Sequence, residues 1–182
     1  MLTLLILLLL AIGFYTGMKR GLVLQIVYTV GYFFVYLIAR TFYQSLAAKL
    51  TLYIPYPSPT AETKLVLFNQ NITLDLDQAF YGAVAFLLIL FFGWLVVRFL
   101  AIFVHGLTFV PIIKQANGLA GGLLSLLVMY VGIFLVLMML SMIPTDSVQN
   151  QFKHSGLAQF IVKDTPVFSK QIYHLWVEKM IQ

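Results

Sequence analysis

Four long apolar stretches set the environment in which this chain of 182 residues can fold. They cover about residues 2–17, 22–39, 79–97 and 119–143. A helix needs roughly 20 mostly apolar residues to cross the hydrocarbon core of a bilayer, so each stretch can supply one crossing. Charged residues make up only 9% of the chain, against about 25% in a soluble domain. The sequence therefore predicts an all-α integral membrane protein with four transmembrane helices.

The composition also excludes several other classes of protein. Hydrophobic residues make up 62% of the chain, which excludes a disordered polymer, and the absence of Cys excludes a disulfide scaffold. The net charge is +5, but Lys and Arg are scattered between the apolar stretches and form no basic stripe. We therefore expect the lipid bilayer, and no nucleic acid, as the partner of this surface.

Lys and Arg in the short connections predict the orientation in the membrane. Lys19 and Arg20 lie between the first two apolar stretches, and Arg98 and Lys114 lie in the segment 98–118 between the last two. Neither connection contains an acidic residue, and short basic loops tend to stay in the cytoplasm. We therefore expect these two connections inside and both chain termini outside.

The outer loop, residues 40–78, follows the second stretch. Its first part has apolar residues at near-helical spacing and predicts a helix lying in the membrane interface. Three prolines then end this helix, and alternating residues over 71–77 predict a short extended stretch. The apolar residues of the interfacial helix are Phe42, Leu46, Leu50 and Tyr53.

The outer tail, residues 144–182, is predicted to form short amphipathic helices. Thr145 to Ser147 offers an N-cap after Pro144, and Thr165-Pro166 offers an N-cap followed by proline at the first helical position. After Pro166 the apolar residues share one side, which we expect to rest on the outer leaflet or on the bundle, with its tryptophan at headgroup level. This side consists of Phe168, Ile172, Leu175, Trp176 and Met180.

Small residues at helical spacing predict two faces for close helix packing. Small side chains let backbones approach each other, which matters because lipid supplies no hydrophobic force between helices. In the face of the fourth helix, Gly118, Ser125 and Gly132 recur every seventh residue, which is the period of two paired helices. The faces either pack inside one bundle, which we favour, or form the seam of a homo-oligomer. They are Gly13, Gly17 and Gly21 in the first helix and Gly118, Gly122, Ser125, Met129 and Gly132 in the fourth.

The second helix carries a polar face that would be costly to expose to hydrocarbon. One interpretation, which we favour, is hydrogen bonding between helices, a common source of cohesion in membrane bundles. The other is the wall of a translocation path. The face consists of Gln25, Tyr28, Thr29, Tyr32 and Tyr36, which share one side of a helix by their spacing.

None of the four apolar stretches contains Asp or Glu. Ion-coupled transporters usually place such groups inside the membrane, and intramembrane hydrolysis needs paired acids, a metal site or an activated nucleophile. The three histidines are far apart in the sequence, and no HExxH pattern occurs. We therefore expect a protein that is not an enzyme and that holds no cofactor and no metal.

Three short motifs resemble those of the colicin V production protein (CvpA) family of bacterial inner-membrane proteins. Residues 17–22 resemble its Gly-x-x-basic-Gly hairpin, residues 117–124 its Gly-x-x-x-Gly entry into the fourth helix, and Ser155-Gly156-Leu157 with Pro166 its outer tail. One departure is the start of the first helix, where many members carry an Asp and this chain has Leu2-Thr3-Leu4.

This resemblance implies a multi-pass protein of the bacterial cytoplasmic membrane, linked to toxin production or export and to envelope maintenance. We expect a non-enzymatic scaffold or accessory factor on which other membrane or envelope proteins dock. The alternative is an oligomeric passive pore, or a lipid or peptide translocation path, lined by the polar face of the second helix. The family motifs carry over to Gly17, Arg20, Gly21, Asn117, Gly118 and Gly122, whose implied role is to shape the two cytoplasmic hairpins.

Overall fold

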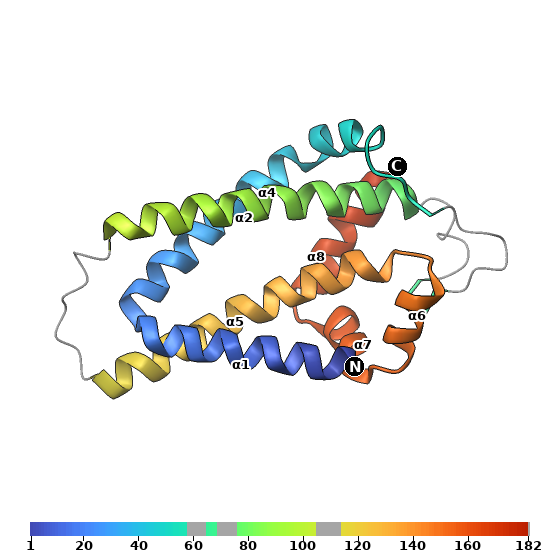
Figure 1. Cartoon of the computed structure of the whole chain (residues 1–182). Helices are drawn as coiled ribbons and strands as arrows, with labels where there is room; N and C mark the ends of the chain where they lie inside the picture. The colour runs from blue at the N-terminus through green and yellow to red at the C-terminus, as the bar shows by residue number, and fades with distance from the viewer. Residues whose placement is uncertain (58–64, 69–75, 105–113, 182) are drawn as a thin grey trace.

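The computed structural model describes residues 1–57, 65–68, 76–104 and 114–181, and every regular element in these ranges is a helix. Four helices are long and apolar enough to cross a membrane (Figure 1). This confirms the predicted all-α membrane fold. The four helices are α1 (Leu2–Arg20), α2 (Leu22–Leu50), α4 (Leu76–Val104) and α5 (Lys114–Ser141).

The long helices form two antiparallel pairs. Helix α1 lies along α5, although the two are far apart in the sequence, and α2 lies along α4 (Figure 1). Helix α2 also crosses α5 and so connects the two pairs, whereas α4 and α5 contact each other sparingly. We name the end where Gly21 joins α1 to α2 the hairpin end, and the opposite end, where residues 144–181 pack, the tail end.

Large apolar side chains cover the outer surfaces of all four helices. This surface would be unfavourable in water, but it suits the hydrocarbon of a bilayer. The pattern explains how a chain with so few charges folds, because lipid rather than protein covers most of these side chains. Examples more than half exposed are Leu4 and Leu8 on α1, Phe33 and Phe34 on α2, Phe91 and Phe99 on α4, and Leu123 and Leu127 on α5.

Helix α2 extends further than the sequence predicted. It continues through residue 40 to Leu50, so the predicted interfacial helix is the last part of α2 and not a separate element. The residues between positions 40 and 50 include no Gly or Pro, and Tyr43 and Ala47 are buried there against the bundle. The extended stretch predicted at 71–77 lies mostly outside the described residues, and its last two, Leu76 and Asp77, begin α4.

The tail folds into a series of short helices. Thr145 occupies the N-cap position of the first one, although its side chain makes no capping hydrogen bond. The start predicted at Thr165-Pro166 is wrong by a few residues, because Thr165 ends α7 and donates its hydroxyl to the carbonyl of Ile161. The tail helices are α6 (Asp146–Lys153), α7 (Gly156–Asp164), α8 (Phe168–Tyr173), the π-helical η2 (His174–Glu178) and α9 (Lys179–Ile181).

The apolar side of the tail packs on the bundle. Trp176 is fully buried, 5.5 Å from the ring of Phe86 on α4, so its predicted place at headgroup level is wrong. The Tyr43 hydroxyl donates to the carbonyl of Leu175 at 2.7 Å. At the start of α1, the hydroxyls of Thr3 and Ser155 lie 2.8 Å apart. Burial against aromatic rings thus holds the tryptophan in the protein.

The segment after α2 is tied to the tail end by tyrosine hydroxyls. Tyr56 donates to the carbonyl of Met142 at 2.7 Å, and Tyr81 donates to the carbonyl of Ile54 at 2.9 Å. Burial, together with the nearby charge of Asp77, raises the pKa of Tyr56 to about 12. The hydroxyl therefore remains a donor, because it stays protonated at neutral pH.

Candidate functional site

The backbones of α1 and α5 approach each other directly at two glycines. A Cβ added to Gly17 would lie 2.5 Å from the carbonyl oxygen of Gly121, and one added to Gly121 would lie 2.7 Å from the carbonyl oxygen of Gly17. One turn earlier in α1, a Cβ on Gly13 would lie 2.8 Å from the Cβ of Met129. Ser125 is buried against Gly17 between these points. Any larger side chain at Gly17 or Gly121 would force the two backbones apart.

The turn between α1 and α2 depends on Gly21 and on a residue of α5. Gly21 has φ of 78°, a left-handed conformation that favours glycine because it has no Cβ. Gly21 has no side chain to cap α2, and the first amides of a helix lack partners within it. The side chain of Asn117 fills this role, since its Oδ1 accepts the Leu22 amide at 2.7 Å. The family motifs at residues 17–22 and 117–124 therefore meet in space.

The other members of the predicted small-residue faces divide into two groups. Gly122 contacts α1, where an added Cβ would meet the flexible side chains of Met18 and Phe14, and Gly118 faces the Met18 carbonyl more loosely. Gly132 is exposed, and no atom lies within 4 Å of an added Cβ. Its predicted place on the packing face is wrong, because the neighbouring Ile133 turns inward instead. Gly121, which the face prediction omitted, makes the closest approach.

The polar face of α2 is turned partly into the bundle. Gln25 and Tyr28 are buried, and the Oε1 of Gln25 has no hydrogen-bond partner among the described residues. Thr29 donates its hydroxyl to the Gln25 carbonyl within its own helix. Tyr36 packs edge-on against Phe86, with ring centroids 5.6 Å apart. Most of the face therefore makes packing contacts, and the half-buried Tyr32 lies towards the hairpin end.

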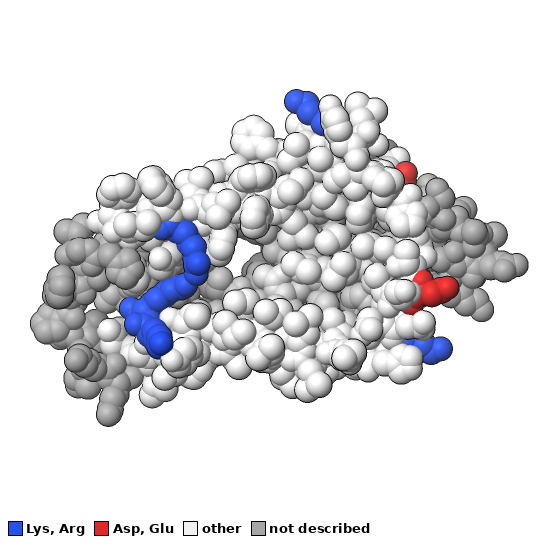
Figure 2. All heavy atoms as spheres, viewed as in Figure 1, with Lys and Arg blue, Asp and Glu red and all other residues white. Residues whose placement is uncertain are grey.

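Basic side chains gather at the hairpin end. Figure 2 shows Lys and Arg atoms in one continuous patch there, while the acidic atoms visible on this side lie near the opposite end. Among the described residues, Lys19 and Arg20 lie in the last turn of α1, and Arg98 lies near the end of α4. The Arg20 guanidinium carbon lies 4.7 Å from the centre of the Tyr28 ring, a distance typical of cation–π contact.

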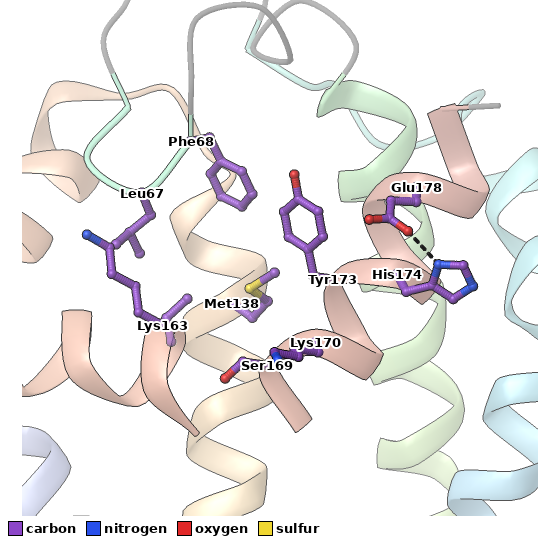
Figure 3. A pocket seen from close by; sticks show the side chains of 10 residues that line it. Leu67, Phe68, Met138, Lys163, Ser169, Lys170, Tyr173, His174 and Glu178 are labelled. Carbon is purple, nitrogen blue, oxygen red and sulfur yellow. Dashed lines mark hydrogen bonds and ion pairs between the residues drawn. The ribbon is translucent and has the colours of Figure 1, made fainter. Parts of the chain in front are cut away.

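A cavity of about 460 Å³ opens at the tail end between the outer loop and the tail (Figure 3). Lys163 of α7 lies on one side and His174 of η2 on the other, with Met138 of α5 between them. The rings of Phe68 and Tyr173 stack beside the cavity, with their centroids 6.4 Å apart. Its lining consists of Leu67, Phe68, Met138, Val162, Lys163, Ser169, Lys170, Tyr173, His174 and Glu178.

The polar groups of this cavity are hydrogen-bond donors and cations more than acceptors. Glu178 carries the one carboxylate of the lining, and this carboxylate pairs with Nδ1 of His174. Burial, and then the charge of Glu178, raise the pKa of Tyr173 above its ordinary value. Lys163 and Lys170 remain exposed at the rim. Sequence reasoning missed this cavity, because residues about a hundred positions apart build it.

The described residues include no group of three or more His, Cys, Asp or Glu that could hold a metal ion. The features described above are the close helix contacts, the hairpin capped by Asn117, the basic hairpin end and a cavity with apolar and polar lining residues. These features define a multi-helix integral membrane protein with a structured tail at one end of its bundle.

Comparison with known proteins identifies the family of this chain. The sequence pattern of the colicin V production protein family matches residues 2–166. The chain is also 32% identical over 178 residues, covering 98% of both chains, to the uncharacterized transmembrane protein YshB of Bacillus subtilis (strain 168). No solved structure matches it. The protein belongs to the colicin V production protein family, as its motifs suggested.

The helix contact predicts opposite outcomes for two glycine substitutions. Gly17→Ala should destabilise the protein by about 1–3 kcal/mol, because the new methyl overlaps the α5 backbone. Gly132→Ala should leave stability unchanged or raise it by up to about 1 kcal/mol, since alanine favours a helix and the site is open. Thermal unfolding in detergent measures both. Equal midpoints for the two variants would contradict the assigned contact.

Proposed function

We propose that this protein is a non-enzymatic accessory factor of the bacterial plasma membrane, on which proteins of the export machinery or the envelope dock. Through them it supports toxin production or export and envelope maintenance. The observation that carries this proposal is the cavity at the tail end, which lies where the tail and residues 67–68 meet α5 and combines apolar lining residues with a cationic rim. Such a surface is suited to a protein segment with apolar and acidic residues.

The chemistry of the long helices supports the same proposal. No Asp or Glu occurs in residues 1–61 or 78–145. Proton and ion relays, as well as most hydrolytic sites in membranes, rely on such groups. Asn117 joins α5 to the start of α2, whereas the hydroxyls of Thr29 and Ser141 donate to carbonyls of their own helices.

A passive pore or translocation path receives less support. Its wall would be the polar face of α2, yet Gln25 and Tyr28 are buried and Tyr36 packs on Phe86 within the same chain. The small-residue face that might join copies of the chain is occupied by α1 in the same chain. The docking proposal needs no oligomer and no lumen.

The proposed function predicts a partner at the cavity. With a photo-crosslinking residue at Lys170, on the rim, irradiated cells should yield a discrete adduct with an envelope or export protein. The matched position Lys153 is exposed on α6 but does not line the cavity, and it should not yield this adduct. Loss of the gene should reduce toxin release and tolerance of envelope stress. Unchanged release and tolerance, or identical adducts at both positions, would count against the proposal.

The orientation is also part of the proposal: the hairpin end faces the cytoplasm and both termini face outward. Its support is that the two hairpin connections carry Lys and Arg without an acidic residue, whereas acids and bases nearly balance in the tail, since Lys and Arg in short loops favour the cytoplasmic side. The chain has no Cys, so a single introduced thiol gives a clean signal.

Thiol labelling of intact cells tests this orientation. Met18→Cys, at an exposed hairpin position, should be protected from an impermeant maleimide, and Gln171→Cys, exposed on α8, should be labelled. Permeabilised cells serve as the control, because both thiols should then react. The reverse pattern in intact cells would place the tail in the cytoplasm.

A further inference from the structure

We propose that the hairpin end holds a binding site for the phosphate of an anionic phospholipid, formed by Arg20 and Arg98 around the tyrosine pair Tyr28 and Tyr32. The inference does not depend on the docking function. It rests on the placement of the two guanidinium groups, on the lack of a carboxylate beside them among the described residues, and on the apolar surface around them.

Aromatic rings position both guanidinium groups. That of Arg20 lies 4.7 Å from the Tyr28 ring centre, and that of Arg98 lies 4.6 Å from the Trp94 ring centre. The centroids of the Tyr28 and Tyr32 rings lie 6.1 Å apart, with an interplanar angle of 28°. The two tyrosines pack in one cluster with Val97 and Ala101 of α4, which flank Arg98 in the sequence. The segment of α4 that carries Arg98 therefore lies beside the tyrosine pair on which Arg20 packs.

No carboxylate balances these cations in the part of the chain that the structure describes. The described acids are Asp77 at the start of α4 and three residues of the tail, all at the tail end. The one ion pair among the described residues, His174 with Glu178, also lies there. Arg20 is partly buried, and a partly desolvated cation is stabilised by an anion at hydrogen-bond distance.

Phosphate matches the chemistry of this site. A guanidinium presents paired N–H donors whose geometry fits two oxygens of a phosphate, and such bonds are among the strongest in proteins. The Tyr32 hydroxyl can donate a third hydrogen bond. Lys19, held over the Tyr15 ring at 4.6 Å, adds positive charge at the same end.

The surrounding surface indicates a lipid as the source of the phosphate. Next to Arg98 on α4, Phe99 is 61% exposed and Ile102 is 65% exposed, and on α2 Ile26 is 45% exposed. Hydrocarbon chains therefore border the site on this side. The acyl chains of a phospholipid would cover them, while its headgroup lies at the end of the bundle, where Lys and Arg attract anionic lipid.

The chain provides its own reporter for a test. It has two tryptophans, and Trp176 is fully buried in the tail end, so Trp176→Phe leaves Trp94 beside Arg98 as the single fluorophore. The full-length Trp176→Phe protein is reconstituted in vesicles of brominated phosphatidylcholine, which quenches tryptophan. Unbrominated phosphatidylglycerol is then added in increasing proportion. If the site exists, phosphatidylglycerol should relieve the quenching well beyond its mole fraction.

Substitutions assign this preference to the two arginines. Near a membrane surface one basic residue contributes about 1 kcal/mol, so each of Arg20→Gln and Arg98→Gln should lower the preference for phosphatidylglycerol by about fivefold. Lys49→Gln, which removes an exposed charge at the tail end of α2, should leave it unchanged. The Arg98→Lys variant keeps the charge and should keep part of the preference. Arg98 is exposed, so its single variants remain testable if the Arg20 variant does not fold.

Three results would overturn the proposal. If quenching of the Trp176→Phe protein falls only in proportion to the mole fraction of phosphatidylglycerol in the vesicles, the arginines form no anionic-lipid site. The same follows if the glutamine variants keep the full preference for phosphatidylglycerol. If soluble glycerol 3-phosphate displaces phosphatidylglycerol at millimolar concentration, the site takes phosphate from water and the assignment to lipid is wrong. Relief that survives glycerol 3-phosphate and is lost in both glutamine variants would support the lipid site.

Discussion

The contact between the α1 and α5 backbones is the constraint on which the rest of this structure depends. Lipid provides no hydrophobic force between helices, so association relies on close van der Waals contact. Gly17 and Gly121 allow this contact, and Gly21 turns the chain directly afterwards into α2. Because α2 must start beside Asn117 of α5, it crosses α5 and reaches α4. The position of α2 therefore follows from the first hairpin.

The two ends of the bundle differ in chemistry. At the tail end, the tail supplies Trp176 and Ile172 to a large apolar core that also includes Phe86 and Phe134. At the hairpin end, a smaller cluster of Leu24, Tyr28 and Ala101 lies beside the basic patch. This asymmetry separates the proposed roles, since a protein partner would meet the structured tail and anionic lipid would meet the arginines.

Helix content, the four crossings and the hairpin glycines could be predicted from the sequence, because apolar length and small-residue spacing are local properties. The heptad spacing failed at Gly132, because the contact of α5 with α1 follows every fourth residue, through Gly121, Ser125 and Met129, and the next residue at this spacing is the buried Ile133. The position of Trp176 could not be predicted, because the tertiary fold decides whether it lies at the headgroups or packs against Phe86. The cavity at the tail end was equally hidden, since its two sides come from distant segments.

A disulfide between α1 and α5 tests the central contact most directly. In the Gly13→Cys/Met129→Cys protein the two Cβ atoms would start 2.8 Å apart, so the helices must separate locally by about 1 Å to reach the usual disulfide separation of about 3.8 Å. Oxidation in native membranes should remove both free thiols while the protein remains a monomer, and Gly13→Cys/Gly132→Cys should stay reduced. Thiols that remain free in the first variant, or crosslinked dimers, would contradict an α1–α5 contact within one chain.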